Sequence, residues 1–434
     1  MDLPAEWLKF APKPRELTGG DRWNVFLSYR SVSRAWVLNL YDVLRELGHK
    51  VFLDQCVLKV GDPLIKGLQS ALSTSQAGVL VWSNATRDSE WVEREYEVLE
   101  KLSTEKKGFQ FVPVKLDTSK LPVFAERRIF LDFSSYPDGP NGGELLRLLH
   151  AVAGVSLSEE AVHFANQQDE AAMVASARIT AAIKNKYPER LLQLFEEGGL
   201  PWKTTSALGC KAAEGLTKLD RNDEAIRMLE ALEGRFPKAV RPRQLHALAL
   251  ARRGRDNDLE KAQEILGELY ALGERDPETL GIYARTWMDR YGKSGDVNDL
   301  KQSRDYYVEA FEAAQDDYYT GINAAAKSVF LGTDEDLGRA AHYAERVQEI
   351  VGTTAHREDY WKTATAAEAL LIQKKYEEAA RLYEAAVSAA RSEIGSHKTT
   401  WKQACRLMEK LQPTAEERLL IRKPFEHLPD CDRM

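Results

Sequence analysis

The sequence predicts an α/β domain followed by an all-α domain. Short apolar runs alternate with amphipathic helical stretches from Arg22 to about Ala153, the pattern of a parallel sheet with helices on its faces. Beyond about residue 156 the strand signals end, and Ala, Leu, Glu, Arg and Tyr recur at helical spacing. The 434 residues also exceed what one ordinary core holds. We therefore predict a leader over residues 1–20, an α/β domain over 21–155 and a helical-repeat domain over 156–434.

Five strands account for the apolar runs of the first part. They are expected at Asn24–Tyr29, Lys50–Asp54, Ala77–Ser83, Phe109–Leu116 and Arg128–Phe133. Helices are expected over Val32–Leu47, Pro63–Leu72, Ser89–Leu102 and Gly143–Val152. Gly48 follows the first helix, where a left-handed residue commonly ends a helix. The alternation with short links predicts a flavodoxin-like, five-stranded parallel sheet, whose ligands bind at the carboxyl ends of the strands.

A repeated pattern runs through the second part. A small residue followed by apolar residues at +4 and +7 recurs at intervals of 37, 41, 37 and 39 residues, and its small residues are Ala225, Ala262, Ser303, Ala340 and Ala379. This spacing resembles the second helix of a tetratricopeptide repeat, slightly lengthened, and predicts a solenoid. An irregular helical bundle is the alternative, because Ala-rich helices produce such triplets by chance.

One short segment of the second part carries a further resemblance. The run D-Y-Y-T-G-I-N-A-A over residues 317–325 resembles a segment of the TRAF-binding helical repeats of MAP kinase kinase kinases. The resemblance supports a divergent repeat region and does not identify a partner.

Composition and charge exclude several classes of function. The net charge of −7 and the pI near 5.8 argue against broad binding to nucleic acid or anionic lipid. The four cysteines lie far apart without a C-x-x-C pair, so neither a disulfide framework nor a zinc site is indicated. No signal peptide or membrane span is visible, and no nucleotide-loop, metalloprotease or hydrolase motif occurs. We expect a cytoplasmic protein without a metal or cofactor.

Ordered motifs in the first part resemble one family. The run V-F-L-S-Y-R-S over residues 25–31 resembles box 1 of TIR (Toll/interleukin-1 receptor) domains, and V-F-L-D over 51–54 resembles their second strand. The run L-K-V-G-D over 58–62 resembles the family's BB loop, and 77–83 its central strand. Finally, S-E-W-V-E-R-E over 89–95 resembles the start of the helix that bears the glutamate of NAD-cleaving members. The resemblance covers about 130 residues and implies a TIR fold.

Within this resemblance, Glu95 is the candidate catalytic carboxylate. Trp91 and Glu95 are four residues apart and share one helix face, so an indole can stack on a flat ring while the acid approaches a ribose. The nicotinamide of NAD⁺ leaves as a neutral ring, so one carboxylate can suffice to stabilise the charge that develops at C1′. The alternative for Glu95 is a solvated acid near a helix N-terminus, and the alternative for Trp91 is a packing anchor.

Other residues are expected near the substrate. The family places nucleotide contacts in the loop that holds Tyr29, Arg30 and Ser31, and Arg30 could pair with a diphosphate or fix the loop through a salt bridge. Asp54 ends a strand and could orient the BB loop or contact the ligand. Trp82 could narrow the pocket or fill the core.

Two positions of the BB loop depart from some NAD-cleaving relatives. Lys59 and Pro63 stand where those relatives carry an acid and an aromatic ring. The departures leave open the substrate affinity and whether the product is ADP-ribose or a cyclic form.

The resemblance implies an NAD⁺ glycohydrolase or cyclase of immune or cell-death signalling, with NAD⁺ as substrate rather than cofactor. Its TIR domains are expected to self-associate, and its repeats to bind an unknown protein or ligand that switches the activity. The alternative is a non-catalytic adaptor that binds proteins through both domains. A TIR enzyme that makes a nucleotide messenger is a third possibility, which the sequence does not separate from simple NAD⁺ depletion.

Overall fold

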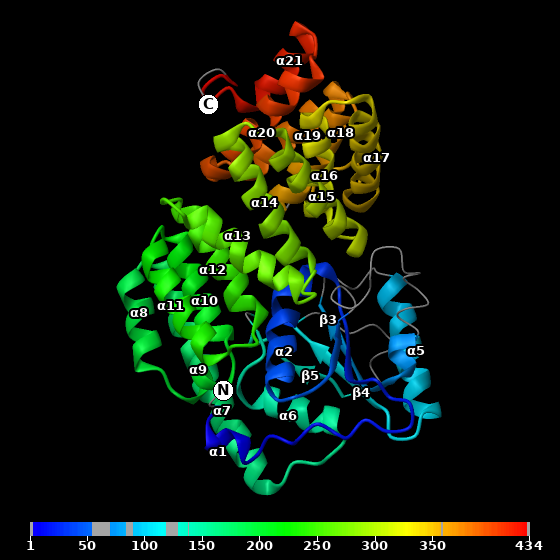
Figure 1. The fold of residues 1–434 in the computed structure, drawn as a ribbon, viewed down its shortest axis with the longest axis vertical. Helices are drawn as coiled ribbons and strands as arrows, with labels where there is room; N and C mark the ends of the chain where they lie inside the picture. Colours follow the sequence, from blue (N-terminus) through cyan, green and yellow to red (C-terminus); the bar gives the residue numbers. More distant parts are fainter. Residues whose placement is uncertain are drawn as a thin grey trace. The chain divides into compact units, whose positions relative to one another are not determined.

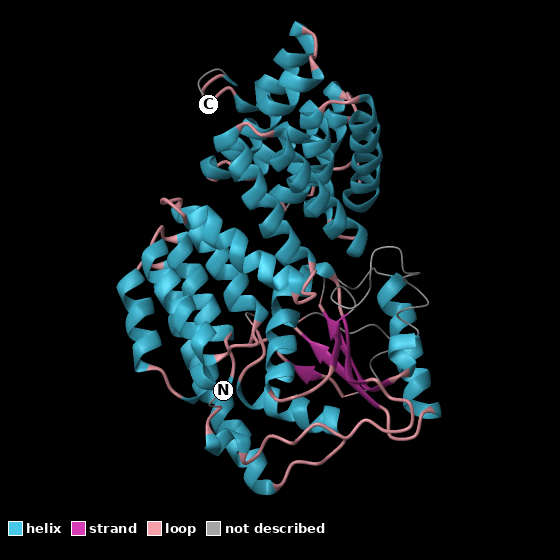
Figure 2. Cartoon of the chain, viewed as in Figure 1, coloured by secondary structure: helices cyan, strands magenta, loops and turns pink. Residues whose placement is uncertain are grey.

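The computed structural model describes residues 3–53, 70–83, 90–118, 129–137, 139–356 and 359–431 of the chain. Contacts divide the chain into two compact units, Met1–Ile282 and Tyr283–Met434. The strands lie in the first unit, and helices make up most of the rest of the described chain (Figure 2). The predicted boundaries at residues 20 and 155 do not coincide with a division between compact units and stay a prediction.

The described residues of the first unit contain one parallel sheet. Its order is β2-β1-β3-β4-β5, and every neighbouring pair is parallel. This order confirms the predicted flavodoxin-like fold with five parallel strands. The strands are β1 (Trp23–Ser28), β2 (Val51–Leu53), β3 (Ser75–Trp82), β4 (Gln110–Lys115) and β5 (Leu131–Asp132).

Helices cover both faces of this sheet. Figure 1 places α5 (Glu90–Glu105) on one side and α2 (Arg34–Glu46) and α6 (Gly142–Ala153) on the other. All eight residues of β3 are buried, as expected for a central strand between two helical layers. The predicted helices over 32–47, 89–102 and 143–152 correspond to these three, and Gly48 has the expected left-handed φ of 89°. The helix predicted over 63–72 lies mostly outside the described residues.

The predicted leader packs against the sheet domain. Its helix α1 (Ala5–Leu8) buries Trp7, which is 1% exposed. Further along, the Arg15 guanidinium donates to the carbonyl oxygens of Gly108 at 2.8 Å and Gln76 at 2.7 Å. The leader therefore contributes to the fold of the first unit.

The remaining described helices form the repeat region, and within each unit many helices that follow one another along the chain are in contact. In the first unit they are α7 (Glu159–Lys184), α8 (Pro188–Glu197), α9 (Leu200–Thr204), α10 (Ala207–Lys218), α11 (Asn222–Arg235), α12 (Val240–Arg253) and α13 (Asp258–Ala271), and α14 (Pro277–Ser294) begins there. The second unit continues with α15 (Val297–Ala313), α16 (Tyr318–Leu331), α17 (Asp334–Val351), α18 (Tyr360–Ile372), α19 (Tyr376–Ala389), α20 (Ile394–Leu411), α21 (Ala415–Arg422) and the 3-10 helix η3 (Lys423–Phe425).

The repeated triplet marks every second helix, as predicted for tetratricopeptide-like hairpins. Its small residues lie in α11, α13, α15, α17 and α19, and each is at most 1% exposed. The predicted repeat is therefore confirmed over an irregular bundle. Gly321 of α16, from the segment 317–325, packs so closely that an added Cβ would lie 2.6 Å from Val347 and 2.8 Å from Phe311.

One expectation from the cysteines is wrong. Cys405 and Cys431 form a disulfide although they are 26 positions apart in the sequence. The segment after α21 turns back onto α20, where the Trp401 indole donates to the Pro429 carbonyl oxygen at 2.9 Å. This return brings the two sulfurs together, and no local spacing announces it. Cys210 is a free, buried thiol, and Cys56 lies outside the described residues.

The contact of α6 with α7 yields a stability prediction. A Cβ built on Gly143 would collide with the backbone carbonyl group of Ala165 in α7, which no rotamer change can move aside. We expect Gly143→Ala to lower the free energy of unfolding by about 1–3 kcal/mol in urea titrations. Gly338→Ala is the control: it lies inside α17 with nothing near the added methyl group, and should raise stability by up to about 1 kcal/mol. An equal effect of both substitutions would contradict the close contact.

Candidate functional site

The candidate site lies at the carboxyl ends of β1 and β3. Ser28, the last residue of β1, pairs with Leu80, so Tyr29 and Arg30 follow β1 beside the place where β3 ends at Trp82. The helix that follows β3, α5, starts at Glu90 near the same edge, as crossover helices in parallel sheets do. The sheet thus brings the loop after β1 and the first turns of α5 to one edge.

The loop after β1 is shaped by a tight turn. The Arg30 carbonyl oxygen accepts the Ser33 N–H at 2.8 Å, and the 3-10 helix η1 (Ser31–Ser33) then leads into α2. The Tyr29 side chain is 7% exposed, whereas that of Arg30 is partly exposed. The side chain of Ser31 lies outside the described residues, as does Asp54.

Trp82 is a core residue of the sheet domain. Its side chain is 2% exposed and belongs to the cluster that joins Phe26 and Phe52 to Leu99 of α5. Its carbonyl oxygen accepts the Leu116 N–H at 2.8 Å, which extends the pairing of β3 with β4. This burial favours the core-filling alternative for its indole, and contact with a ligand stays a prediction.

The position of Glu95 is fixed by the helix that bears it. Trp91 and Glu95 both lie in α5, and their side chains lie outside the described residues. The next turns hold the helix on the sheet: Tyr96 is buried with its ring 5.3 Å from Phe111, and Leu99 is fully buried against β3. Because Glu95 is four positions before Leu99, it lies one turn nearer the carboxyl edge of the sheet. Residues 58–63 of the predicted BB loop are also outside the described part.

A second group of polar residues, which the sequence did not predict, joins α2 to the repeat helices. The Asp42 carboxylate accepts the backbone N–H groups of Val240 at 2.8 Å and Arg241 at 3.1 Å. The Glu46 carboxylate accepts the Lys238 N–H at 2.8 Å. We call this contact the α2 seam. It caps α12, whose own N-cap residue, Ala239, has no side chain that could accept a hydrogen bond.

Charged side chains of the α2 seam lie in largely buried surroundings. Arg45 forms an ion pair with Glu274, which is 4% exposed, and the Tyr41 hydroxyl donates to the same carboxylate at 3.4 Å. Burial, together with the negative charge of Glu274, raises the pKa of Asp42 to about 8, although the two amide donors and Arg45 oppose the shift. The seam therefore contains a carboxyl group that resists ionisation.

The Arg241 side chain turns away from Asp42. Its guanidinium binds Glu214 at 2.7 Å and Glu278 at 2.8 Å, on two other helices of the repeats.

One signal of the α2 seam was present in the sequence. Asp42 and Glu46 look like ordinary surface charges of a helix, but the helix that begins at Val240 lacks a capping residue of its own.

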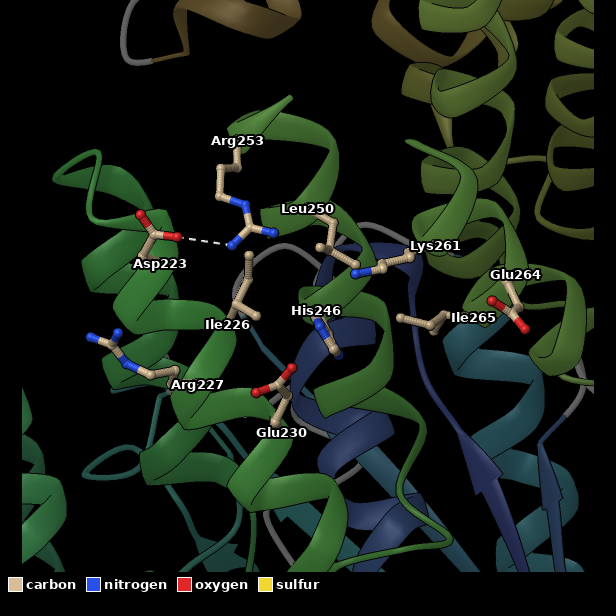
Figure 3. A pocket seen from close by; sticks show the side chains of 10 residues that line it. All are labelled: Asp223, Ile226, Arg227, Glu230, His246, Leu250, Arg253, Lys261, Glu264 and Ile265. Atoms are coloured by element: carbon tan, nitrogen blue, oxygen red, sulfur yellow. Dashed lines mark hydrogen bonds and ion pairs between the residues drawn. The ribbon is translucent and has the colours of Figure 1, made fainter. Parts of the chain in front are cut away.

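An open, polar hollow of about 530 Å³ lies between α11, α12 and α13 (Figure 3). Arg227 and Lys261 bring positive charge to it, and Glu230 and Glu264 bring negative charge. Arg253 binds Asp223 at 2.8 Å across its rim.

Among the described residues no three His, Cys, Asp or Glu side chains gather as a metal site would require. None of the described helices has the length and apolar character to cross a membrane.

Comparisons with known proteins place two families along the chain. Residues 25–148 match the TIR domain, and residues 221–329 match the family described as Tetratricopeptide Repeats-Sensor. The chain therefore contains a TIR domain in its N-terminal part and tetratricopeptide-like sensor repeats after it.

Curated relatives match within the TIR domain. The probable 2' cyclic ADP-D-ribose synthase TcpB of Brucella melitensis is 35% identical over 80 residues, which are 18% of this chain and 32% of that protein. TcpB of Brucella abortus matches with the same identity and coverage. The chain thus spans about a third of the length of these relatives.

Solved structures with repeats are similar at low identity. A thermophilic tetratricopeptide-repeat protein of Thermus thermophilus is 15% identical, with a TM-score of 0.36, over 47% of this chain and 98% of that one. Yeast Tom70 is 14% identical, with a TM-score of 0.38, over 96% of this chain and 71% of that one.

The shifted pKa of Asp42 predicts a pH dependence. Because its folded-state pKa of about 8 exceeds the ordinary value of 3.8, the folded protein holds a proton that the unfolded chain releases. The contribution of this proton to the free energy of unfolding is complete below about pH 4. It is lost as the pH rises through about 8, with a slope of up to about 1.4 kcal/mol per pH unit. We expect the free energy of unfolding of Asp42→Asn to fall less steeply than that of the wild type between pH 5 and pH 8.

The difference between the pH profiles of wild type and Asp42→Asn isolates the effect of Asp42, because the other titrating groups of the chain contribute equally to both profiles. The charged or titratable groups that face Asp42 are Arg45 on its own helix, Glu274, and the Cys210 thiol of α10, together with the start of α12. Parallel pH profiles of wild type and Asp42→Asn would contradict the shift.

Proposed function

We propose that the TIR domain cleaves the nicotinamide N-glycosidic bond of NAD⁺, with Glu95 as the essential carboxylate. The observation that carries the proposal is the position of Glu95 in the second turn of α5, at the sheet edge that also receives the loop with Tyr29 and Arg30. Similarity to a protein named as a probable 2' cyclic ADP-D-ribose synthase supports chemistry on an NAD-derived substrate. The product is ADP-ribose or a cyclised form.

Cleavage of the bond between nicotinamide and the ribose needs no proton donor for the leaving group. Nicotinamide carries the positive charge in NAD⁺ and leaves as a neutral ring, so the developing positive charge at the ribose C1′ is what needs stabilising. The Glu95 carboxylate supplies the opposing negative charge and accepts hydrogen bonds from the ribose hydroxyls, a role worth about 3 kcal/mol or more at comparable sites. Trp91 stacks on a flat ring, and Arg30 pairs with the diphosphate.

The remaining assignments belong to the same proposal. Ser31, Asp54 and Trp82 complete the surroundings of the substrate, and NAD⁺ serves as substrate without a separate cofactor. TIR domains of several copies associate, and the repeats receive the protein or ligand that controls them. The protein acts in immune or cell-death signalling in the cytoplasm.

One observation favours a second function. Lys59 and Pro63 replace an acid and an aromatic ring of some NAD-cleaving TIR domains, as a domain without a substrate would tolerate. The second candidate is therefore an adaptor that binds other proteins through its TIR and repeat surfaces.

Replacing Glu95 tests the enzyme directly. We expect the full-length Glu95→Gln variant to lose at least about a hundredfold in nicotinamide release, because the amide keeps the shape and removes the charge. Glu97→Gln is the matched control: the same helix bears Glu97, whose side chain is exposed, and its activity should equal that of the wild type. Chromatography of nicotinamide and of the ribose product measures both variants. Equal activity of Glu95→Gln and wild type would exclude the assigned carboxylate.

Replacing Arg30 tests the assigned diphosphate contact. Arg30→Ala should raise KM for NAD⁺ by roughly tenfold or more, since a charge-assisted pair is worth about 1.5–3 kcal/mol. Steady-state kinetics with NAD⁺ and with nicotinamide riboside, which lacks the diphosphate, separate the two roles. If KM rises equally for both substrates, Arg30 shapes the loop and does not bind the diphosphate.

A further inference from the structure

The helix α2 is buried on more than its sheet-facing side. Eleven of its thirteen residues are buried, although a helix that covers one face of a sheet needs to bury only one stripe. The additional buried stripe is polar and consists of Asn39, Asp42 and Glu46, which follow one another at helical spacing. Each meets the repeat helices: Asn39 accepts the Ser206 hydroxyl at 3.4 Å, and the other two accept backbone N–H groups before and at the start of α12.

This polar stripe adds directional hydrogen bonds to the α2 seam. Asp42 and Glu46 accept N–H groups at and just before the start of α12 that have no partner within the helix, and water can replace these hydrogen bonds once the surfaces part. Asp42 and Glu274 are two acidic groups in one buried region, and the positive charge of Arg45 in α2 acts on both. Such a contact holds in one geometry and weakens sharply when the geometry changes.

The helix α12 contacts both the TIR domain and the hollow between α11, α12 and α13. Its first turn receives the Asp42 carboxylate of the TIR domain, and its later turns present His246, Leu250 and Arg253 to the hollow shown in Figure 3. A ligand or peptide that seats in the hollow would contact α12 directly, on the helix whose first N–H groups hold the TIR domain. The repeat region thus contains one rigid element that touches both places.

We propose that the α2 seam is an intramolecular latch, through which α12 holds the TIR domain on the repeats and restrains its activity until α12 moves. The restraint of activity rests on the proposed NAD⁺ cleavage, whereas the latch itself rests on the contacts of Asp42 and Glu46. Opening the seam releases α2 from the repeats and leaves the sheet of the TIR domain folded.

The test uses full-length protein and measures the contact without reference to activity. Asp42→Ala removes both acceptor oxygens, and Asp42→Asn keeps one and preserves size in case the first variant folds poorly. Asp296→Ala is the matched control, because Asp296 also caps a repeat helix, through the Asn298 N–H at 2.9 Å, and lies in the second unit. Hydrogen exchange of the amides of residues 238–241 reports the seam, and exchange in β1 and β3 reports the sheet.

The latch predicts exchange about tenfold faster at residues 238–241 in Asp42→Ala, since two hydrogen bonds are lost, with β1 and β3 as protected as in the wild type. Nicotinamide release should rise several-fold in this variant and remain unchanged in Asp296→Ala. Unchanged exchange at 238–241, or loss of protection in the seam and the sheet together, would overturn the latch.

Activity distinguishes this inference from the proposed function. If the seam opens in Asp42→Ala and the active wild type gains nothing, the contact exerts no restraint and the inference fails. If the seam opens and neither protein consumes NAD⁺, the proposed enzyme fails while the contact behaves as a latch.

Discussion

A parallel sheet needs apolar cover on both faces, and the first unit of this protein follows from that constraint. Neither face of β3 reaches water, so α5 must lie on one side and α2 and α6 on the other. Packing of α5 through Tyr96 and Leu99 determines where its first turns, and with them Glu95, meet the edge of the sheet. The candidate site is therefore a consequence of how the sheet is covered.

The helices on the other side, α2 and α6, also form hydrogen bonds with the repeat helices. Asp42 of α2 caps a repeat helix, and in the opposite direction Asp169 of α7 accepts the N–H groups of Gly143 at 2.7 Å and Glu144 at 3.1 Å at the start of α6. The Tyr136 hydroxyl also donates to Asp169, at 2.6 Å. The TIR domain and the first repeats thus cap each other's helices through directional polar contacts.

Local patterns predicted the sheet and the repeats because the apolar pattern of each strand or helix lies within a short stretch of consecutive residues. The alternation of apolar runs yielded all five strands, and the triplet at Ala225, Ala262 and its successors identified the second helix of each hairpin. Contacts between distant segments carry no such signal. Asp42 and Val240 are 198 residues apart, and the cysteines of the disulfide lack a motif. Of the candidate site, the positions of Tyr29, Arg30 and Trp82, the backbone of Ser31 and the helix of Glu95 are described, so the assigned roles stay predictions.

We propose that one chain combines a carboxylate-dependent NAD⁺ cleavage with a restraint at α2. The most direct measurement compares nicotinamide release by full-length Asp42→Ala with that of the double variant Asp42→Ala/Glu95→Gln. We predict release of nicotinamide above the wild-type level in the first variant and a return to background in the second, because the released domain still depends on its carboxylate. Equal release by the two variants would contradict the account, since the activity would then come from elsewhere.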